Sequence, residues 1–243
     1  MKTIKYLFLA VFLSTAISGC SYFPQSRDVL FQTSNMNAIF HGVYDGEMTY
    51  KELRRHGDFG IGTFNGLDGE LFGLDGKFYQ MKADGLSYPV DGSMETPFAV
   101  VTFFEPDKSI LLDKASDYNE LQQYLDNVLP TKDIFYAIKI EGPFRYIKAR
   151  SIPKQNKPYL PFDEVVKNQL TFEFHDVGGT IVGFRCPAYM EGINYPGYHL
   201  HFITKDRKAG GHLLECQMEN VKVEIDYTSE FHMALPESRQ SIK

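Results

Sequence analysis

The segment GYHLHFITKDRKAGGH, residues 197–212, constrains the fold more than any other, because it holds three of the seven histidines of the chain. Side chains alternate between the two faces of an extended strand, so His199 and His201 share one face. The polar residues that follow end in Gly210-Gly211, which predicts a turn that returns the chain and brings His212 back beside the pair. We therefore expect a β-hairpin that presents three imidazoles at one place.

Three neutral imidazoles suit Zn²⁺, and the remaining coordination positions are then open to water or substrate, as in a catalytic zinc site. Copper, nickel and iron also accept imidazole, so the residue types alone leave the ion open. The competing interpretation is a set of surface histidines on a solvated strand face. The other four histidines lack such neighbours and are interpreted as structural or exposed: His41, His56, His175 and His232.

The rest of the chain alternates short strand patterns with a few helical ones, which is typical of an α+β protein. Thr49-Tyr50-Lys51-Glu52 has capping-box spacing, and Gly57 is a plausible C-cap, so a short helix is expected between them. The apolar face of residues 117–128 predicts a second helix, and residues 162–170 a third. Strand patterns cover residues 97–104, 134–141, 171–174, 180–184 and 221–225.

The strand patterns before and after the predicted helix of residues 117–128 predict two sheet-based halves. Residues 36–131 are expected to form the N-terminal half, and residues 132–243 the C-terminal half with the histidine hairpin. The chain has 243 residues, 43% of them hydrophobic, which is enough to bury a substantial core. Its net charge of −6, without runs of lysine and arginine, argues against a nucleic-acid partner.

Residues 1–20 are interpreted as a targeting segment, because two lysines precede an apolar stretch that is too short to span a bilayer. The stretch ends in Ile17-Ser18-Gly19-Cys20, which resembles a bacterial lipoprotein signal, in which the cysteine is lipidated. We expect an exported lipoprotein of a bacterial cell envelope, anchored to a membrane through Cys20, with residues 21–35 as a tether. An ordinary cleaved secretory signal is the alternative. Cys186 and Cys216 could pair or remain buried thiols.

A local repeat lies in the N-terminal half. Residues 66–72, GLDGELF, are followed at once by residues 73–79, GLDGKFY, and the two Asp-Gly turns predict a meander of hairpins. The repeat breaks at Glu70, where the second copy has Lys77. A carboxylate at the start of an apolar strand, just after a tight turn, is well placed to project into a cleft. A solvated glutamate at a strand end is the other interpretation.

Three blocks of this sequence, in the right order, resemble the α-acetolactate decarboxylases and extend over nearly the whole mature chain. They begin with FQTSNMNAIF, EGPFRYIKAR and GFRCPAYMEG. The resemblance implies decarboxylation of 2-acetolactate to acetoin at a zinc held by three histidines, which fall on His199, His201 and His212. It also implies an active-site glutamate at Glu70 of GLDGEL and an active-site arginine at Arg150 of KARSIP. The implied fold has two mixed sheets with helices and the zinc in the cleft between the halves, in a homodimer.

The residue types agree with this carboxy-lyase chemistry. Loss of CO₂ leaves two electrons that pass into the neighbouring ketone as an enediolate, whose charge zinc stabilises as a Lewis acid. Arg150 offers a planar fork of donors for a carboxylate or oxyanion, and Glu70 can orient the hydroxyl and relay the proton. Without the resemblance, Arg150 would be interpreted as a surface or ion-paired arginine. The other function class is a membrane-anchored, non-catalytic protein that binds a metal or a small hydroxy-keto acid.

Overall fold

The computed structural model describes residues 27–235. The expected targeting segment with Cys20 therefore lies outside the described residues. Residues 29–33, which were expected to belong to the tether, instead form a buried strand that is paired on both sides. Within the described range, no helix is both long enough and apolar enough to cross a bilayer.

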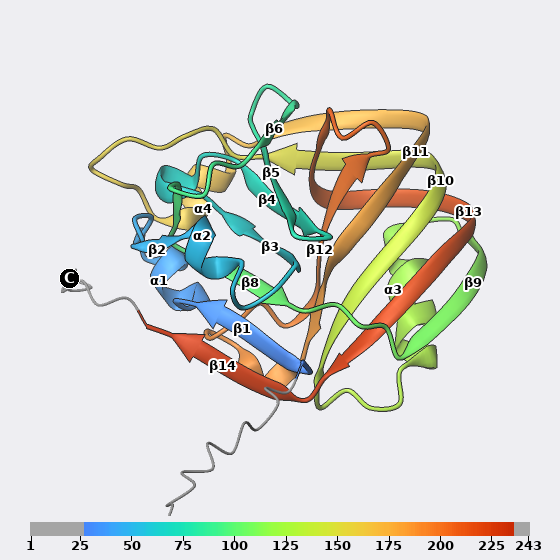
Figure 1. Ribbon diagram of the computed structural model, residues 1–243. Coiled ribbons are helices and arrows are strands. Elements are labelled where there is room, and N and C mark those ends of the chain that lie inside the picture. The colour runs from blue at the N-terminus through green and yellow to red at the C-terminus, as the bar shows by residue number, and fades with distance from the viewer. Residues whose placement is uncertain (1–26, 236–243) are drawn as a thin grey trace, which may run out of the picture.

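Two large sheets lie side by side and make up most of the molecule (Figure 1). The first has seven strands in the order β14-β1-β8-β3-β4-β5-β6. It is mixed, because β1 and β14 run parallel while the other neighbours are antiparallel. In this order its strands are β14 (Glu230–Ala234), β1 (Val29–Thr33), β8 (Ala99–Thr102), β3 (Phe59–Thr63), β4 (Glu70–Leu74), β5 (Lys77–Met81) and β6 (Ser87–Pro89).

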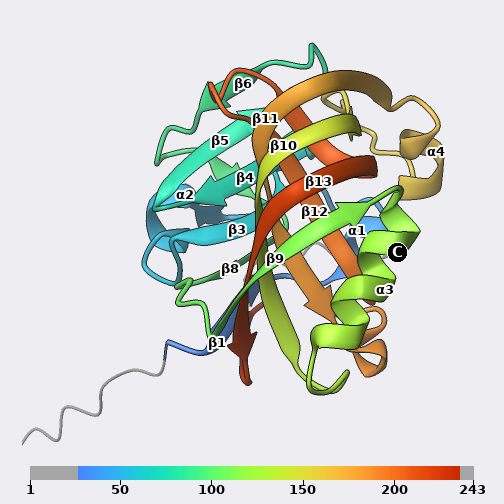
Figure 2. The same cartoon turned by 90° about the vertical axis from the view of Figure 1, so that its right-hand side faces the viewer.

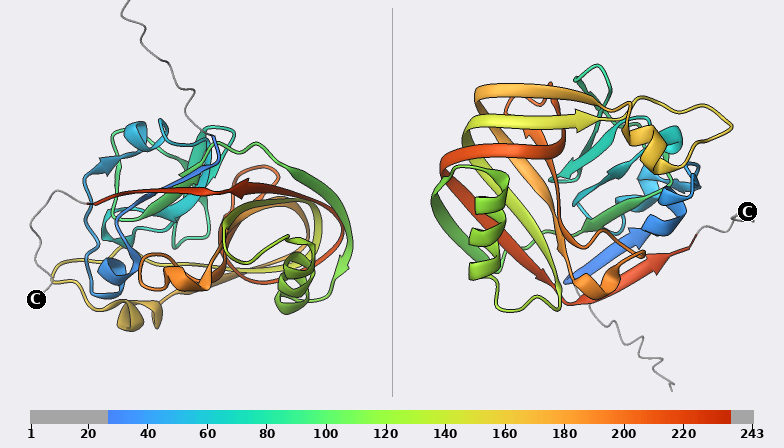
Figure 3. Two further views of the ribbon diagram at one scale, coloured as in Figure 1. Left: turned by 90° about the horizontal axis from the view of Figure 1, so that it is seen from below. Right: turned by 180° about the vertical axis from the view of Figure 1, so that it is seen from behind.

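The second sheet has five strands in the order β10-β11-β12-β13-β9, and β10 also pairs with β13. These pairings close four strands into a ring, which is seen nearly end-on in the left view of Figure 3. All of its neighbours are antiparallel, so the expectation of two mixed sheets is right for the first sheet only. Its strands are β10 (Phe135–Ser151), β11 (Leu170–Cys186), β12 (Gly197–Thr204), β13 (Gly210–Thr228) and β9 (Lys108–Ala115).

The two sheets do not divide the chain at a single point. β9 precedes residue 132 but pairs with β13 in the second sheet, and β14 follows β13 but pairs with β1 in the first. Each sheet thus holds a strand from the other half of the sequence. A short pair, β2 (Met48–Thr49) with β7 (Glu95–Thr96), completes the strands of the described range.

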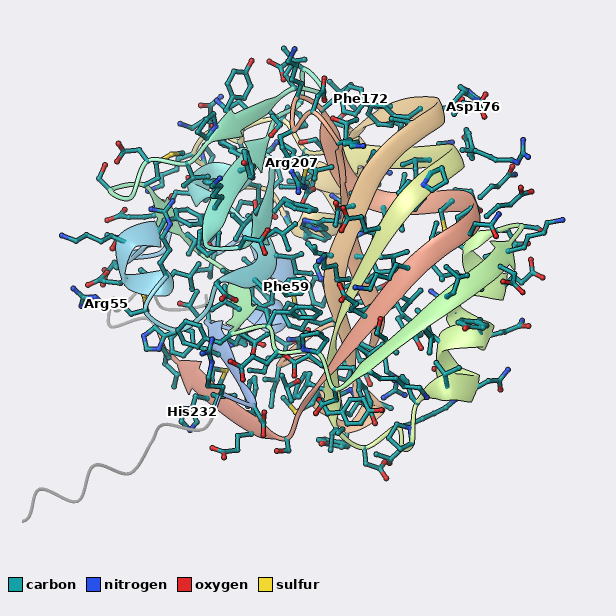
Figure 4. All side chains as sticks on the ribbon, turned by 45° about the vertical axis from the view of Figure 1, so that its right-hand side comes forward. Arg55, Phe59, Phe172, Asp176, Arg207 and His232 are labelled. Carbon is teal, nitrogen blue, oxygen red and sulfur yellow. The ribbon has the colours of Figure 1, made fainter. Side chains whose placement is uncertain are left out.

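The main core lies between the two sheets. Phe59 of β3, labelled in Figure 4, is fully buried there and packs edge-on against Phe184 of β11. A second core fills the closed part of the second sheet and extends under α3, which lies beside β9 in Figure 2. The α-helices are α1 (Met36–Phe40), α2 (Tyr50–Leu53), α3 (Tyr118–Val128) and α4 (Phe162–Val166).

Both cysteines of the described range, Cys186 and Cys216, are buried free thiols, so the pairing left open by the sequence does not form.

Candidate active site

The β12–β13 hairpin brings the three histidines together. In the register of the two strands His201 lies opposite His212, and His199 is two residues away on the same face. Nε2 of His201 lies 3.2 Å from Nε2 of His199 and 3.3 Å from Nδ1 of His212. The three residues each offer one ligand atom within a span of 4.8 Å. The sequence prediction of a triad on one hairpin therefore matches the observed arrangement.

The two glycines before His212 have a different role from the predicted one. The hairpin turns at residues 205–208, and Gly210 and Gly211 are already strand residues. A Cβ on Gly210 would lie 2.2 Å from the carbonyl oxygen of Phe202, and one on Gly211 would lie 2.5 Å from that of Arg150. Both glycines thus allow neighbouring backbones to approach closely beside the histidines.

A backbone carbonyl fixes the orientation of the His201 ring. Nδ1 of His201 lies 2.6 Å from the carbonyl oxygen of Leu71, which belongs to β4 of the first sheet. A carbonyl only accepts hydrogen bonds, so Nδ1 carries the proton and the unprotonated Nε2 faces the other two histidines. The first sheet thus positions a side chain of the second.

Burial keeps all three imidazoles neutral. Burial and, to a smaller extent, charge repulsion from Arg150 lower the pKa of His199 to about 3. Burial also lowers the pKa of His201 and of His212 well below the usual value, and their charged neighbours add to this effect. Neutral imidazole is the form that binds a metal. The three imidazoles can therefore bind one at neutral pH without first losing a proton.

Two of the three nitrogen separations match those expected around a tetrahedral metal ion such as zinc. Nitrogens bound at about 2.0–2.1 Å in tetrahedral geometry lie about 3.3 Å apart, and the separations from His201 to His199 and His212 are 3.2 and 3.3 Å. The donor set and its spacing therefore suit a divalent transition metal of this kind.

Glu70 and Arg150 form a buried ion pair beside the triad. Oε1 of Glu70 accepts a hydrogen bond of 2.6 Å from Nη1 of Arg150, and the two side chains are only 8% and 11% exposed. The other carboxylate oxygen, Oε2, lies 3.7 Å from Nε2 of His201. Strand register places Arg150 opposite His212 in the β10–β13 ladder, whereas Glu70 begins β4 and comes from the first sheet.

Two opposing effects act on the carboxyl group of Glu70. Burial raises its pKa, and the guanidinium of Arg150 lowers it. Burial is the larger effect, so the pKa of Glu70 lies above its usual value. A carboxyl group in this state can hold and release a proton closer to neutral pH than a solvated one.

A cavity of about 320 Å³, here called the active-site pocket, lies at this group and is lined by residues from both sheets. Its polar lining includes Glu70, Arg150, His199 and His212. An apolar wall comes from α1 and α4, which lie next to each other in the right view of Figure 3. Its side chains are Met36, Ile39, Phe40, Phe162 and Val166. The sequence did not identify these side chains as pocket-lining, because apolar residues that line a pocket have the same sequence pattern as core residues.

All five predicted site residues therefore meet in one place. The histidines that were interpreted as structural or exposed do not join them. His175 lies on β11 with 67% of its side chain exposed, and His56 stacks on Phe31. Sequence reasoning missed the carbonyl of Leu71, since no side-chain type encodes a carbonyl contact. It also missed Tyr195, whose ring lies 6.0 Å from that of His199.

Comparisons with known proteins agree on one family. The family model described as alpha-acetolactate decarboxylase matches residues 30–241. The alpha-acetolactate decarboxylase of Methanosarcina mazei is 53% identical over 88% of this chain and 74% of its own length. That of Methylococcus capsulatus is 45% identical over 96% of this chain and 91% of its own length.

A solved structure of alpha-acetolactate decarboxylase from Bacillus subtilis strain 168 has the same fold. It superposes with a TM-score of 0.85 at 42% identity and covers 87% of this chain and 90% of its own. The match spans both sheets. The chain therefore belongs to the alpha-acetolactate decarboxylase family.

Proposed function

We propose that this protein converts 2-acetolactate to acetoin and CO₂ in a zinc-dependent reaction, with His199, His201 and His212 as the metal ligands. Membership of the family makes the chain a carboxy-lyase. The observation that carries the proposal is the Glu70–Arg150 pair, buried beside three converging imidazole nitrogens in one pocket. A binding protein needs no buried proton carrier beside its metal ligands, so the non-catalytic alternative is less favoured.

Arg150 is the group that recognises the substrate carboxylate or the oxyanion that develops from it. Its guanidinium lines the pocket and presents several N–H donors in one plane. Among the described residues Glu70 is the hydrogen-bond partner of this guanidinium. An incoming carboxylate therefore competes with Glu70 for Arg150, which weakens the ion pair and raises the proton affinity of Glu70 further.

The reaction breaks the bond between C2 and the carboxylate carbon, and the electron pair passes into the adjacent ketone to give an enediolate. When bound, zinc would supply Lewis-acid stabilisation of this negative charge. Glu70 delivers a proton to the carbon that lost CO₂ and is reprotonated from solvent, which supplies the one proton that the overall reaction consumes. Because Glu70 reaches the pocket from the β4 side only, one face of the enediolate receives the proton, and one acetoin enantiomer forms.

The apolar wall from α1 and α4 contributes by excluding water. Met36, Ile39 and Phe162 line the same small cavity as Arg150, so they accommodate the methyl groups of the substrate. A poorly hydrated pocket also strengthens the interaction of Arg150 with a developing negative charge.

Acetoin formation from racemic 2-acetolactate by the purified protein tests this function. The metal-depleted protein should be nearly inactive, and added Zn²⁺ should restore turnover with one acetoin enantiomer in excess. Undiminished activity after complete metal removal would contradict the zinc dependence. No turnover in either state would favour the binding protein.

We also propose that the protein is exported, is anchored to a membrane through a lipid on Cys20, and acts as a homodimer. The lipoprotein-type sequence of residues 1–20 supports the anchor, and the family resemblance supports the dimer. Cys20→Ala should abolish labelling by a fatty-acid analogue and leave an unprocessed precursor. Equal label in wild type and Cys20→Ala would refute the anchor, and a monomeric mass in light scattering would refute the dimer.

A further inference from the structure

A second cavity adjoins the active-site pocket. This side pocket has a volume of about 700 Å³ and is lined by polar side chains of α3, among them Gln122 and Gln123. The side pocket and the active-site pocket share three lining residues: Tyr195, His212 and Leu214. These three side chains therefore form the boundary between the two cavities.

Tyr195 contributes the largest side chain to this boundary and is held in place by its neighbours. Its backbone N–H donates to Oδ1 of Asn194 at 2.6 Å, and Nδ2 of Asn194 donates to Oε1 of Gln32 at 2.7 Å. Nε2 of Gln32 donates back to the carbonyl of Ile193 at 2.8 Å. Gln32 and Asn194 are 0% and 4% exposed, and such a buried, hydrogen-bonded amide pair fixes the segment to β1.

Leu214 completes the boundary because β13 is irregular at this point. Leu213 pairs with Ala149 and Glu215 pairs with Lys148, so Leu214 is an extra residue on β13 that has no partner on β10. Such a bulge changes the direction of a side chain relative to the regular alternation. Leu213 is 2% exposed and lines the side pocket only, whereas Leu214 lines both cavities.

We infer that Tyr195 is a specificity-determining residue: its ring separates the side pocket from the active-site pocket and so limits the size of the substituents on the substrate. The inference rests on the proposed decarboxylation. Tyr195 is 49% exposed, and its ring lies against the ring of His199, so removal of the ring would join the two cavities beside the metal ligands. One added methylene in a confining pocket changes discrimination by roughly 10–200-fold.

The test compares 2-acetolactate with two homologues, one with ethyl in place of the C2 methyl and one with propanoyl in place of acetyl. Tyr195→Ala should raise the kcat/KM of at least one homologue relative to that of 2-acetolactate by about 10-fold or more. Tyr195→Phe should keep the wild-type ratio because the ring remains. The ratio does not depend on the fraction of correctly folded enzyme, so partial misfolding cannot imitate the effect.

Tyr189→Ala is the matched control. Tyr189 lies in the same segment and is 67% exposed, but it lines neither cavity, so its replacement should leave both ratios unchanged. Unchanged ratios in Tyr195→Ala, or an equal change in Tyr189→Ala, would overturn the inference.

A binding measurement separates this inference from the proposed function. The affinities of 2-hydroxy-2-methylbutanoate and 2-hydroxy-2-methylhexanoate for the zinc-loaded protein require no chemistry, and Tyr195→Ala should shift their ratio toward the longer acid. If wild-type protein fails to decarboxylate 2-acetolactate but this ratio shifts, the proposed function falls and the role of Tyr195 stands. If decarboxylation proceeds and neither ratio shifts, the role of Tyr195 falls.

Discussion

Glu70 and His201 are connected through one short piece of backbone. The carbonyl of Leu71 orients His201, and Glu70, the preceding residue, pairs with Arg150. A change in the position of β4 would therefore disturb the metal ligands and the proton carrier together. This coupling makes conservative substitutions, which leave the backbone in place, the informative ones.

Glu70→Gln separates proton transfer from packing. The amide keeps the size of the side chain and can still accept a hydrogen bond from Arg150, but it cannot carry the proton. General acid–base assistance is worth about 10²–10⁴-fold, so we expect kcat to fall within this range while zinc content stays at the wild-type level. Asp68→Asn is the control, because Asp68 is two residues away and pairs instead with Lys82 at 3.2 Å. Unchanged turnover by zinc-loaded Glu70→Gln would remove the proton-relay role.

The sequence alone identified some of the site residues but not all of them. Glu70 was identifiable because it interrupts a local repeat. The histidines were identifiable because strand alternation and a single hairpin turn are enough to bring them together. Arg150 gave no local signal, since its neighbours come from distant segments: His212 through strand register and Glu70 from the other sheet. Only the family resemblance indicated it.

The elements of the fold were predictable where local signals decide them. The helix predicted over residues 117–128 is α3, with Asp117 as its N-cap. Thr49 and Glu52 form the predicted capping box of α2, although the helix ends at Leu53, before Gly57. The third predicted helix is shorter than expected and ends at Val166.

Strand lengths were underestimated. Two separately predicted strands, residues 171–174 and 180–184, are parts of one strand of 17 residues, β11. The polar residues between them are exposed, so the apolar pattern is interrupted while the backbone ladder with β10 continues. Hydrophobic periodicity reports the burial of side chains and does not report the pairing of the backbone.

Gly210→Ala tests the packing of the hairpin. The new Cβ would lie 2.2 Å from the carbonyl oxygen of Phe202, so β12 and β13 must separate beside His201 and His212. We expect lower zinc content and a loss of stability of about 1–3 kcal/mol, as for an overpacked core. Gly178→Ala is the control, because its Cβ would make only ordinary contacts at 3.6 Å. Equal zinc content and equal stability in the two variants would contradict this role.

At the scale of the whole molecule, the exchange of β9 and β14 ties the two sheets together. Asp226 lies near this exchange, on β13, and its carboxylate accepts a hydrogen bond of 3.0 Å from the backbone N–H of Glu105. It is 1% exposed. Burial raises the pKa of Asp226 to about 7, and the hydrogen bond from Glu105 opposes the shift only in part.

This pKa predicts a pH dependence of stability. Between the ordinary pKa of 3.8 and about 7, the unfolded chain has lost the proton of Asp226 while the folded chain retains it. The free energy of unfolding therefore falls as pH rises through this window, by about 1–4 kcal/mol at 1.36 kcal/mol per pKa unit. Asp226→Asn should abolish this component, and Glu173→Gln, at an exposed position of β11, should retain it. Parallel pH profiles of wild type and Asp226→Asn in denaturant unfolding would contradict the assignment.

The most direct test of zinc-dependent catalysis at the histidine triad is a titration of metal-depleted protein with Zn²⁺, in which acetoin formation is measured at each addition. The rate should rise linearly and level off at one zinc per chain. His201→Ala should neither bind zinc at this stoichiometry nor regain activity, whereas His175→Ala should follow the wild-type curve. Full activity of His201→Ala, or a wild-type rate that does not depend on added metal, would contradict a catalytic zinc at this site.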